Sequence, residues 1–242
     1  MPRPSRTVRV VGEGRAGGSF SRALRDVGWV VDAVAGRDPS IARAASAVDL
    51  VLICVADEHV ATVAARIERG DAVVAHVAGS HGLEVLSSHD RRAAVHPLVA
   101  LPNAEVGAMR LRSGATFAVA GDAIAREVVE ALDGRAIDVP DESRAAYHAA
   151  AAIASNHLVG LLGQAERVAA TAGLELDVYL DLVRATVDNV AALGPRAALT
   201  GPAAREDHAT IERHLAALDE SERDAYRVMV EQCRRLVREV RT

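Results

Sequence analysis

The stretch Val8-Arg9-Val10-Val11-Gly12-Glu13-Gly14-Arg15-Ala16-Gly17 decides the fold of this chain. A short β-branched run leads into Gly12-x-Gly14-x-x-Gly17, and residues with helical spacing follow as far as Gly28. A strand, a glycine turn and a helix in that order form the context in which this spacing binds a dinucleotide. Gly12 permits the tight turn, Gly14 lets the backbone approach a pyrophosphate, and Gly17 lets the helix pack closely on the strand.

The residues after the turn indicate which dinucleotide is bound. The helix offers unpaired N–H groups at its first residues, Arg15 and Ala16, to the phosphates. A second expected strand, 29–35, ends at Gly36-Arg37-Asp38, where the ribose is recognised. Arg37 comes before the acid, and its planar guanidinium suits a 2′-phosphate. The sequence therefore predicts a preference for NADP(H), with an ordinary βα turn and a solvated loop arginine as the alternatives.

Composition excludes several other classes of protein. Half of the 242 residues are apolar, and the formal net charge is −5, which favours neither nucleic acid nor an anionic membrane as a partner. The two cysteines, Cys54 and Cys233, form neither a metal spacing nor a disulfide framework, so we expect no metal. No signal peptide precedes Thr7 and no apolar run matches a membrane span, so we expect a cytoplasmic protein. All 28 basic residues are arginine.

The first half of the chain alternates strand and helix patterns, which predicts an α/β fold with a parallel Rossmann sheet over residues 1–140. Further strands are expected at 49–55, 72–78, 92–98, 116–121 and 135–140, and helices at 39–47, 58–69 and 122–132. Ligands of such sheets lie outside the carboxyl ends of the strands. Besides the glycine turn, the loops expected there carry Ala56-Asp57, Gly79-Ser80-His81 and His96-Pro97. Ala56 and Asp57 are predicted to contact the cofactor, and Asp57 is also a candidate helix N-cap.

Strand patterns stop at Asp141, and residues 141–242 are predicted to form an all-helical domain. A helical run over 142–173 is expected to bend near 160–163. Further helices are expected at 175–193, 203–218 and 220–241, the last capped by Asp219. The apolar area of these helices exceeds what one subunit hides, so we predict a homodimer.

Three stretches carry a resemblance to a known family. They are His148 to His157, Ala198 to Arg205 with Asp207 and Thr210 after it, and His96-Pro97-Leu98. With the glycine turn they resemble the Rossmann-like oxidoreductases that carry a C-terminal helical domain of unknown function 2520. That family is similar to the 6-phosphogluconate and β-hydroxyacid dehydrogenase clan, and some relatives are atypical ketopantoate reductases. This chain departs from it by having Glu206 where members often have glycine, and by lacking the lysine proton donor of the wider clan.

Without lysine, a carbonyl reductase needs another proton donor. His148 is the candidate donor, because the pKa of imidazole lies near neutrality, with Ser155 and Asn156 as substrate hydrogen-bonding groups. His96, also a candidate substrate contact, is the rival donor. The alternative is that these groups only pack the helix.

A second set of candidates concerns the substrate. Arg205 is the candidate for binding a substrate carboxylate, since its fork contacts both oxygens, and Thr200 shapes its loop. An ion pair of Arg205 with Glu206 or Asp207 is the alternative. The predicted function is an NADPH-dependent reductase of a small keto acid, with 2-dehydropantoate favoured. A non-catalytic NADP(H) sensor or assembly protein and a deazaflavin-dependent oxidoreductase are the other possibilities.

Overall fold

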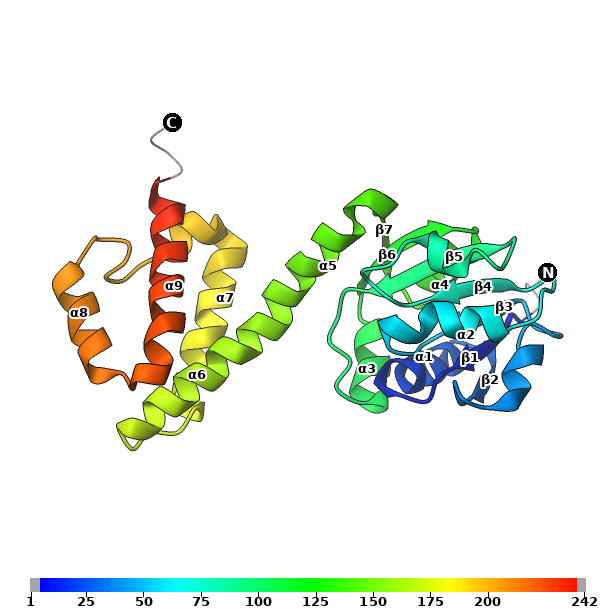
Figure 1. Ribbon diagram of the computed structural model, residues 1–242, viewed down its shortest axis with the longest axis horizontal. Helices are drawn as coiled ribbons and strands as arrows, with labels where there is room; N and C mark the ends of the chain where they lie inside the picture. The colour runs from blue at the N-terminus through cyan, green and yellow to red at the C-terminus, as the bar shows by residue number, and fades with distance from the viewer. Residues whose placement is uncertain (1–4, 239–242) are drawn as a thin grey trace. The chain divides into compact units, whose positions relative to one another are not determined.

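The computed structural model describes residues 5–238, and the chain divides by contact into two compact units, Met1–Asn156 and His157–Thr242. The first unit contains a sheet with helices on both faces, and the second contains only helices (Figure 1). The first unit runs past residue 140, where we place the domain boundary, because it includes helix α5 (Arg144–Ala152).

The sheet has seven strands in the order β2-β1-β3-β4-β5-β6-β7. Each strand falls in one of the apolar runs that predict it, which confirms the α/β class with a helical C-terminal part. The strands are β1 (Thr7–Val11), β2 (Val30–Val34), β3 (Leu50–Ile53), β4 (Val73–His76), β5 (Arg92–Pro97), β6 (Thr116–Gly121) and β7 (Arg135–Asp138).

The expectation of a wholly parallel sheet is wrong at one ladder. β5 and β6 pair antiparallel, with Val95 opposite Val119, whereas all other neighbours in the sheet are parallel. The connection between them therefore leaves and re-enters the sheet at the same end of the strands. There the Leu98 N–H extends the ladder by donating to the Thr116 carbonyl at 2.8 Å. This connection contains helix α3 (Ala104–Leu111), which packs against α1 (Arg15–Asp26) and has no counterpart among the predicted helices.

The sheet is covered on both faces, and β3 shows why. All four of its residues are buried, and Leu50 and Leu52 face one apolar core while Val51 and Ile53 face another. Such unbroken burial is typical of a parallel strand with helices on either side. Trp29, the chain's one tryptophan, belongs to the first core. The remaining helical segments of this unit are α2 (Val60–Arg66), α4 (Ile124–Ala131), and 3₁₀ turns at Pro39–Arg43, Asp57–His59, Leu83–Leu86 and Asp141–Ser143.

The second unit consists of four helices, α6 (Leu158–Thr171), α7 (Asp177–Ala198), α8 (His208–Ala217) and α9 (Glu220–Arg238). The predicted bend at residues 160–163 is wrong, because α6 continues through both glycines, and the irregularity is a π-helical turn at Ile153–His157. An isolated glycine weakens a helix without ending it. Gly194 does interrupt α7, with a φ of 78°. The predicted helix residues 239–241 lie outside the described part.

Two caps fix the boundaries of the last helices. α8 begins at His208 rather than at 203, because Asp207 caps it by accepting the Thr210 N–H at 3.0 Å. Asp219 accepts the Ser221 N–H at 2.9 Å, and α9 starts beside it as predicted.

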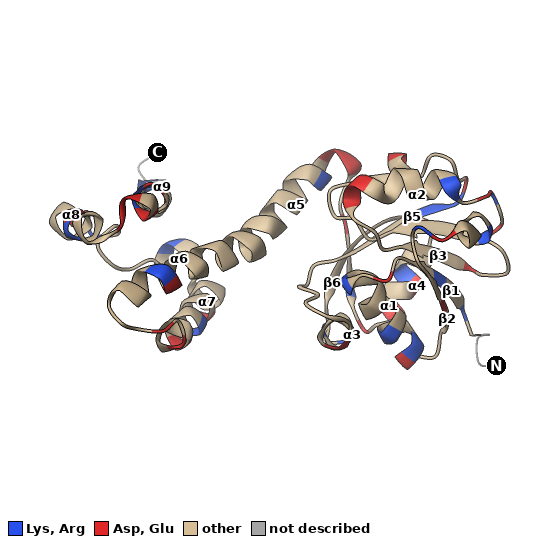
Figure 2. Cartoon of the chain, turned by 60° about the horizontal axis from the view of Figure 1, so that its bottom comes forward, with Lys and Arg blue, Asp and Glu red and all other residues tan. Residues whose placement is uncertain are grey.

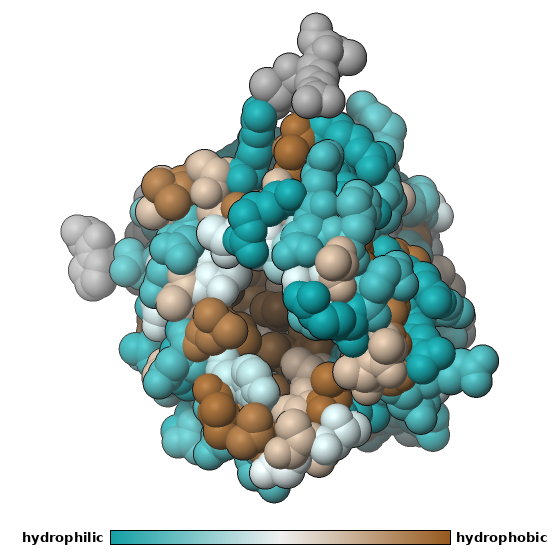
Figure 3. Space-filling model, turned by 90° about the vertical axis from the view of Figure 1, so that its left-hand side faces the viewer, coloured by the Kyte–Doolittle hydropathy of each residue, from teal (hydrophilic) through white to brown (hydrophobic). Residues whose placement is uncertain are grey.

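The helical unit buries few of its apolar side chains. Five of its residues belong to the buried apolar set, namely Ala169, Ala203, Ile211, Leu215 and Leu218. In contrast, Leu182 and Leu193 of α7 are 65% and 60% exposed. Figure 3 views the helical unit, where brown apolar patches interrupt the teal surface. Among residues 5–238, no helix combines the length and the apolar character that crossing a bilayer requires.

Candidate functional site

A cleft of about 440 Å³ lies at the carboxyl ends of β1, β3, β4 and β5. This is the edge at which parallel sheets of this kind bind ligands. Its lining includes five of the residues predicted to bind the cofactor, namely Gly14, Arg15, Ala16, Ala56 and Asp57.

The three glycines of the turn have different physical roles. Gly12 has a φ of +117°, and a Cβ there would lie 2.4 Å from the Cys54 carbonyl oxygen. A Cβ on Gly17 would lie 1.8 Å from the Gly12 carbonyl oxygen, so the fold itself requires both glycines. A Cβ on Gly14 would meet no protein atom within 4 Å. Gly14 therefore borders open space at the first turn of α1, which fits the approach of a pyrophosphate.

The loop after β2 presents Arg37. Arg66 holds this loop by donating to the backbone carbonyl oxygens of Gly36 at 3.0 Å and Asp38 at 3.1 Å. The Asp38 carboxylate accepts the Ser40 N–H at 2.7 Å, and this bond lowers the pKa of Asp38. That carboxylate therefore caps its own turn, and the neighbouring Arg37 side chain is exposed. A guanidinium in this position suits a phosphate better than a hydroxyl.

Asp57 serves a different purpose from the predicted N-cap. Its carboxylate accepts a hydrogen bond from Ser80 Oγ at 2.7 Å, and the first turn of the following helix has no side-chain cap. The His81 ring lies 3.2 Å from the Asp57 carbonyl oxygen. Two of the predicted loops are thus joined at the carboxyl edge, and the cap prediction fails because Ser80 is the better-placed partner.

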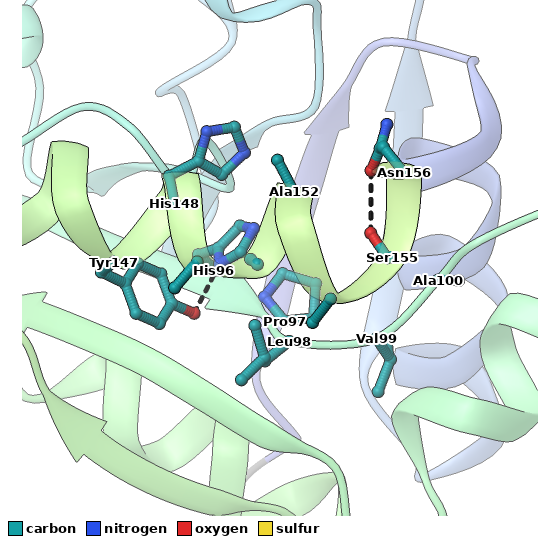
Figure 4. Close-up of a pocket in the computed structure, with 13 residues that line it drawn as sticks. His96, Pro97, Leu98, Val99, Ala100, Tyr147, His148, Ala152, Ser155 and Asn156 are labelled. Atoms are coloured by element: carbon teal, nitrogen blue, oxygen red, sulfur yellow. Dashed lines mark hydrogen bonds between the residues drawn. The ribbon is translucent and has the colours of Figure 1, made fainter. Parts of the chain in front are cut away.

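A second cavity, of about 690 Å³, lies between the end of β5 and helix α5 (Figure 4). Its volume is within the range typical of small-molecule sites. The side chains that line it are His96, Pro97, Leu98, Val99, Ala100, Tyr147, His148, Ala150, Ala151, Ala152, Ala154, Ser155 and Asn156. Three of these, His96, Pro97 and Val99, also line the cleft beside the glycine turn, so the two cavities are neighbours.

Three rings meet where the cavities adjoin. His96 Nδ1 lies 2.8 Å from the Tyr147 hydroxyl, and the two rings pack edge to face (Figure 4). The His148 ring packs edge-on against His96 with centroids 5.8 Å apart. Gly79 makes room for both imidazoles, since a Cβ there would lie 2.6 Å from His148 Cδ2 and 2.7 Å from His96 Nε2. The predicted residues His96 and His148 are therefore brought together, one from the sheet and one from α5.

Burial sets the charge state of the histidines on the sheet. It lowers the pKa of His96 to about 4, and the neighbouring His148 and Arg144 add to this shift. His76, whose ring nitrogens contact the Gly82 carbonyl oxygen and the Ala78 N–H, also has a pKa lowered by burial to about 4. Both imidazoles are therefore neutral at neutral pH and have no imidazolium proton to give.

Arg144 lies fully buried at the start of α5. Its Nε contacts Asp141 Oδ1 at 3.4 Å, while Nη1 and Nη2 have no hydrogen-bond partner among the described residues. The guanidinium charge lowers the pKa of Tyr147, although burial, the larger influence, raises it overall. Arg144, Tyr147 and His148 have the spacing i, i+3, i+4, which places them on one face of the helix. Tyr147 is not among the residues predicted from the sequence, since the spacing shows only that it shares a helix face with His148 and not that it meets His96.

Ser155 and Asn156 line the same cavity as His148. They belong to the π-helical turn, and Ser155 Oγ donates to Asn156 Oδ1 at 2.8 Å (Figure 4). Turns of this kind occur frequently at functional sites. Both side chains are exposed, which leaves them accessible to a ligand.

Thr200 and Arg205 belong to the second unit, and both are exposed. The alternative partner Asp207 is engaged with Thr210, which lowers the pKa of Asp207. The role of Arg205 in binding a carboxylate stays a prediction. No group of three potential metal ligands is assembled among the described side chains.

Residues 116–233 match the family model described as a domain of unknown function, DUF2520. This stretch of the chain is similar to that family. The match begins at β6, so the matched region includes the last two strands of the sheet, α5 with Tyr147 and His148, and most of the helical unit. None of the curated proteins matches the chain.

Solved structures with the same fold cover almost the whole chain. A protein from Bacteroides fragilis, described as a candidate NADP oxidoreductase, matches with a TM-score of 0.79 and 20% identity, over 96% of this chain and 98% of that one. A Thermotoga maritima protein matches with a TM-score of 0.73 and 24% identity, over 97% and 100%. A reductive aminase from Aspergillus terreus, solved with a nicotinamide cofactor, cyclohexanone and allyl amine, matches with a TM-score of 0.71 and 16% identity, over 98% and 95%. These likenesses show a Rossmann-like fold with a helical C-terminal part.

Proposed function

We propose that this protein is an NADPH-dependent oxidoreductase that reduces a C=O or C=N bond of a small molecule. One observation carries the proposal: the cleft beside the glycine turn and the cavity under α5 share His96, Pro97 and Val99. A nucleotide in the first cavity and a substrate in the second would therefore meet at the end of β5. The neighbours described as an NADP oxidoreductase and a reductive aminase support the same activity.

The residues of the cleft fit the proposed cofactor. The open space at Gly14 and the N–H groups of Arg15 and Ala16 would receive the pyrophosphate, and Arg37 the 2′-phosphate. A bound reduced nicotinamide supplies a hydride to the substrate carbon. The protein then has to exclude water, hold the substrate and deliver one proton. Ser155 and Asn156 are proposed to hold the substrate, and His148 and Tyr147 are the two side chains of α5 placed to supply the proton.

A small keto acid is the finer proposal for the substrate, with 2-dehydropantoate favoured. The side chains that line the α5 cavity include no arginine and no acid, and its largest share is alanine and other apolar residues. A carboxylate therefore needs a cation from outside this lining, and Arg205 is the proposed one.

The proposal is tested by measuring NADPH binding and then NADPH oxidation against a panel of keto acids, neutral ketones and cyclic imines. Turnover of any member with NADPH, well above turnover with NADH, is the expected result. Tight NADPH binding with no turnover across the panel would replace the reductase by a nucleotide-binding sensor. Absence of NADPH binding would overturn the proposal altogether.

We also propose that the protein is a homodimer associated through its helical unit. Residues 145–165 contain no Asp, Glu, Lys or Arg, and α5 is accordingly tan, without blue or red, beyond its first turn (Figure 2). In the helical unit, Val159, Val178 and Leu182 are 70%, 61% and 65% exposed. Exposed apolar helices of this extent mark interaction surfaces, and symmetric dimers are the commonest assemblies. Location in the cytoplasm stays a prediction from composition.

A further inference from the structure

We infer that Tyr147, rather than His148, is the catalytic residue that gives its proton to the heteroatom of the reduced bond. This inference rests on the proposed function and assigns the donor within the same site. Tyr147 lines the α5 cavity, and its hydroxyl is hydrogen-bonded to His96, one of the three residues common to both cavities.

The first support is orientation. A catalytic acid or base is typically held by a third group that fixes its direction. His96 Nδ1 lies 2.8 Å from the Tyr147 oxygen, and the edge-to-face packing of the two rings restrains the phenol further. With neutral His96 donating through Nδ1–H, the phenol oxygen accepts that bond and its own hydrogen is free to face the cavity. For His148, no ring hydrogen bond is found among the described residues.

The second support is charge. A phenol is protonated at neutral pH, so the donor is ready in every molecule, but its anion must be tolerated after transfer. The fully buried Arg144 lies one helical turn before Tyr147, and within residues 5–238 its Nη1 and Nη2 have no hydrogen-bond partner. Burial raises the pKa of Tyr147, and the charge of Arg144 opposes that shift by favouring the phenolate. Arg144 is thus a positioning residue that stabilises the anion formed by the step.

The step balances without further reactants. With the hydride supplied to carbon, the π electron pair of the C=O or C=N bond becomes the new bond between the heteroatom and the proton. The electron pair of the broken O–H bond stays on the Tyr147 oxygen. A proton from solvent that enters the cavity then restores the phenol, while His96 keeps its Nδ1 proton and continues to hold the Tyr147 oxygen.

The test compares Tyr147→Phe with the matched variant His148→Asn, which removes the rival donor from the same helix face. For Y147F we expect kcat to fall by about 100-fold or more, the range typical of a lost general acid. The NADPH Kd should stay within about twofold, since only the chemical step is affected. H148N should lower kcat much less than Y147F does, because the His148 ring packs against His96 without holding the phenol. Retention of kcat by Y147F, or an equal loss in both variants, would overturn the inference.

A fluorinated tyrosine placed at position 147 gives a readout that a structural role would not move. Fluorine lowers the phenol pKa, so the alkaline limb of the kcat profile should shift to lower pH; an unmoved limb contradicts a proton-donating phenol. Fluorine NMR of the same label measures the phenol pKa without turnover, and Arg144→Met should raise it. If no substrate turns over in wild-type protein, the proposed function fails. The NMR titration still decides whether Arg144 acts on this phenol, and an unchanged pKa in R144M overturns that part.

Discussion

Arg66 Nη1 donates a hydrogen bond to the Gly36 carbonyl oxygen at 3.0 Å, and this bond ties helix α2 to the loop that presents Arg37. The loop is thereby fixed from the side of the neighbouring βα unit rather than by its own short turn. A fixed loop loses less conformational entropy when a charged ligand binds to it.

Arg37→Ala should raise the Kd for NADPH by roughly 10- to 100-fold, since hydrogen bonds to charged groups contribute about 1.5–3 kcal/mol. The Kd for NADH should change little, because NADH lacks the 2′-phosphate. Fluorescence titration with both nucleotides measures the two constants. Arg69→Ala, which removes an exposed arginine elsewhere, is the control. Equal changes for both nucleotides would contradict recognition of the phosphate by Arg37.

Substitutions at Gly14 and Gly17 should separate folding from cofactor binding. Gly14→Ala should leave Tm within about 2 °C of wild type, because the added methyl group meets no protein atom. The same methyl should weaken NADPH binding at least tenfold by filling the pyrophosphate space. Gly17→Ala should instead unfold the protein or lower Tm strongly, since its Cβ would lie 1.8 Å from a backbone oxygen. Normal NADPH affinity in folded G14A would place the nucleotide elsewhere.

Stability should fall as the pH drops below neutrality. Burial lowers the pKa of His76 from 6.5 to about 4. Between pH 6.5 and pH 4 the unfolded chain therefore binds a proton at His76 that the native state does not bind. Stability is therefore full above pH 6.5 and is lost progressively toward pH 4, by about 2 kcal/mol for this group between pH 7 and pH 5. His96 acts in the same direction. Denaturant unfolding at the two pH values measures the loss, and His76→Gln should reduce it; an unreduced loss would exclude His76 as its source.

A charge on the exposed apolar face of α7 should dissociate the proposed homodimer. Leu182 is 65% exposed, and Leu182→Asp should shift the mass in light scattering at micromolar concentration from dimer to monomer. Arg184→Glu is the matched control, because it changes charge on the same helix without placing it on apolar surface. A wild-type monomer would contradict the proposed homodimer. A dimer that survives L182D would exclude α7 from its interface.

The sequence could predict the strands and the glycine turn because both depend on local patterns. Four consecutive buried residues in β3 and the three glycines before α1 leave few alternatives. The direction of β6 could not be predicted in this way. It depends on pairing between residues far apart in the chain, such as the bond from the Leu98 N–H to the Thr116 carbonyl.

The candidate site divides in a similar manner. His96 and His148 were identifiable as titratable residues at a strand end and on a helix. Tyr147 was missed because its significance depends on His96, a partner 51 residues away in the chain. The π-helical turn at Ile153–His157 has no sequence signature of its own, so the alanine-rich run around it indicates an ordinary helix.

Trp29 lies in the core of the sheet unit and gives that half of the chain a fluorescence reporter of its own. Its emission follows only the melting of the sheet unit. Of the two thiols, Cys54 is buried and its pKa is raised far above the ordinary value, whereas Cys233 on α9 is partly accessible. A dye coupled to Cys233 would report on the helices alone. Parallel melts of the two signals would therefore reveal whether the halves unfold together or in sequence.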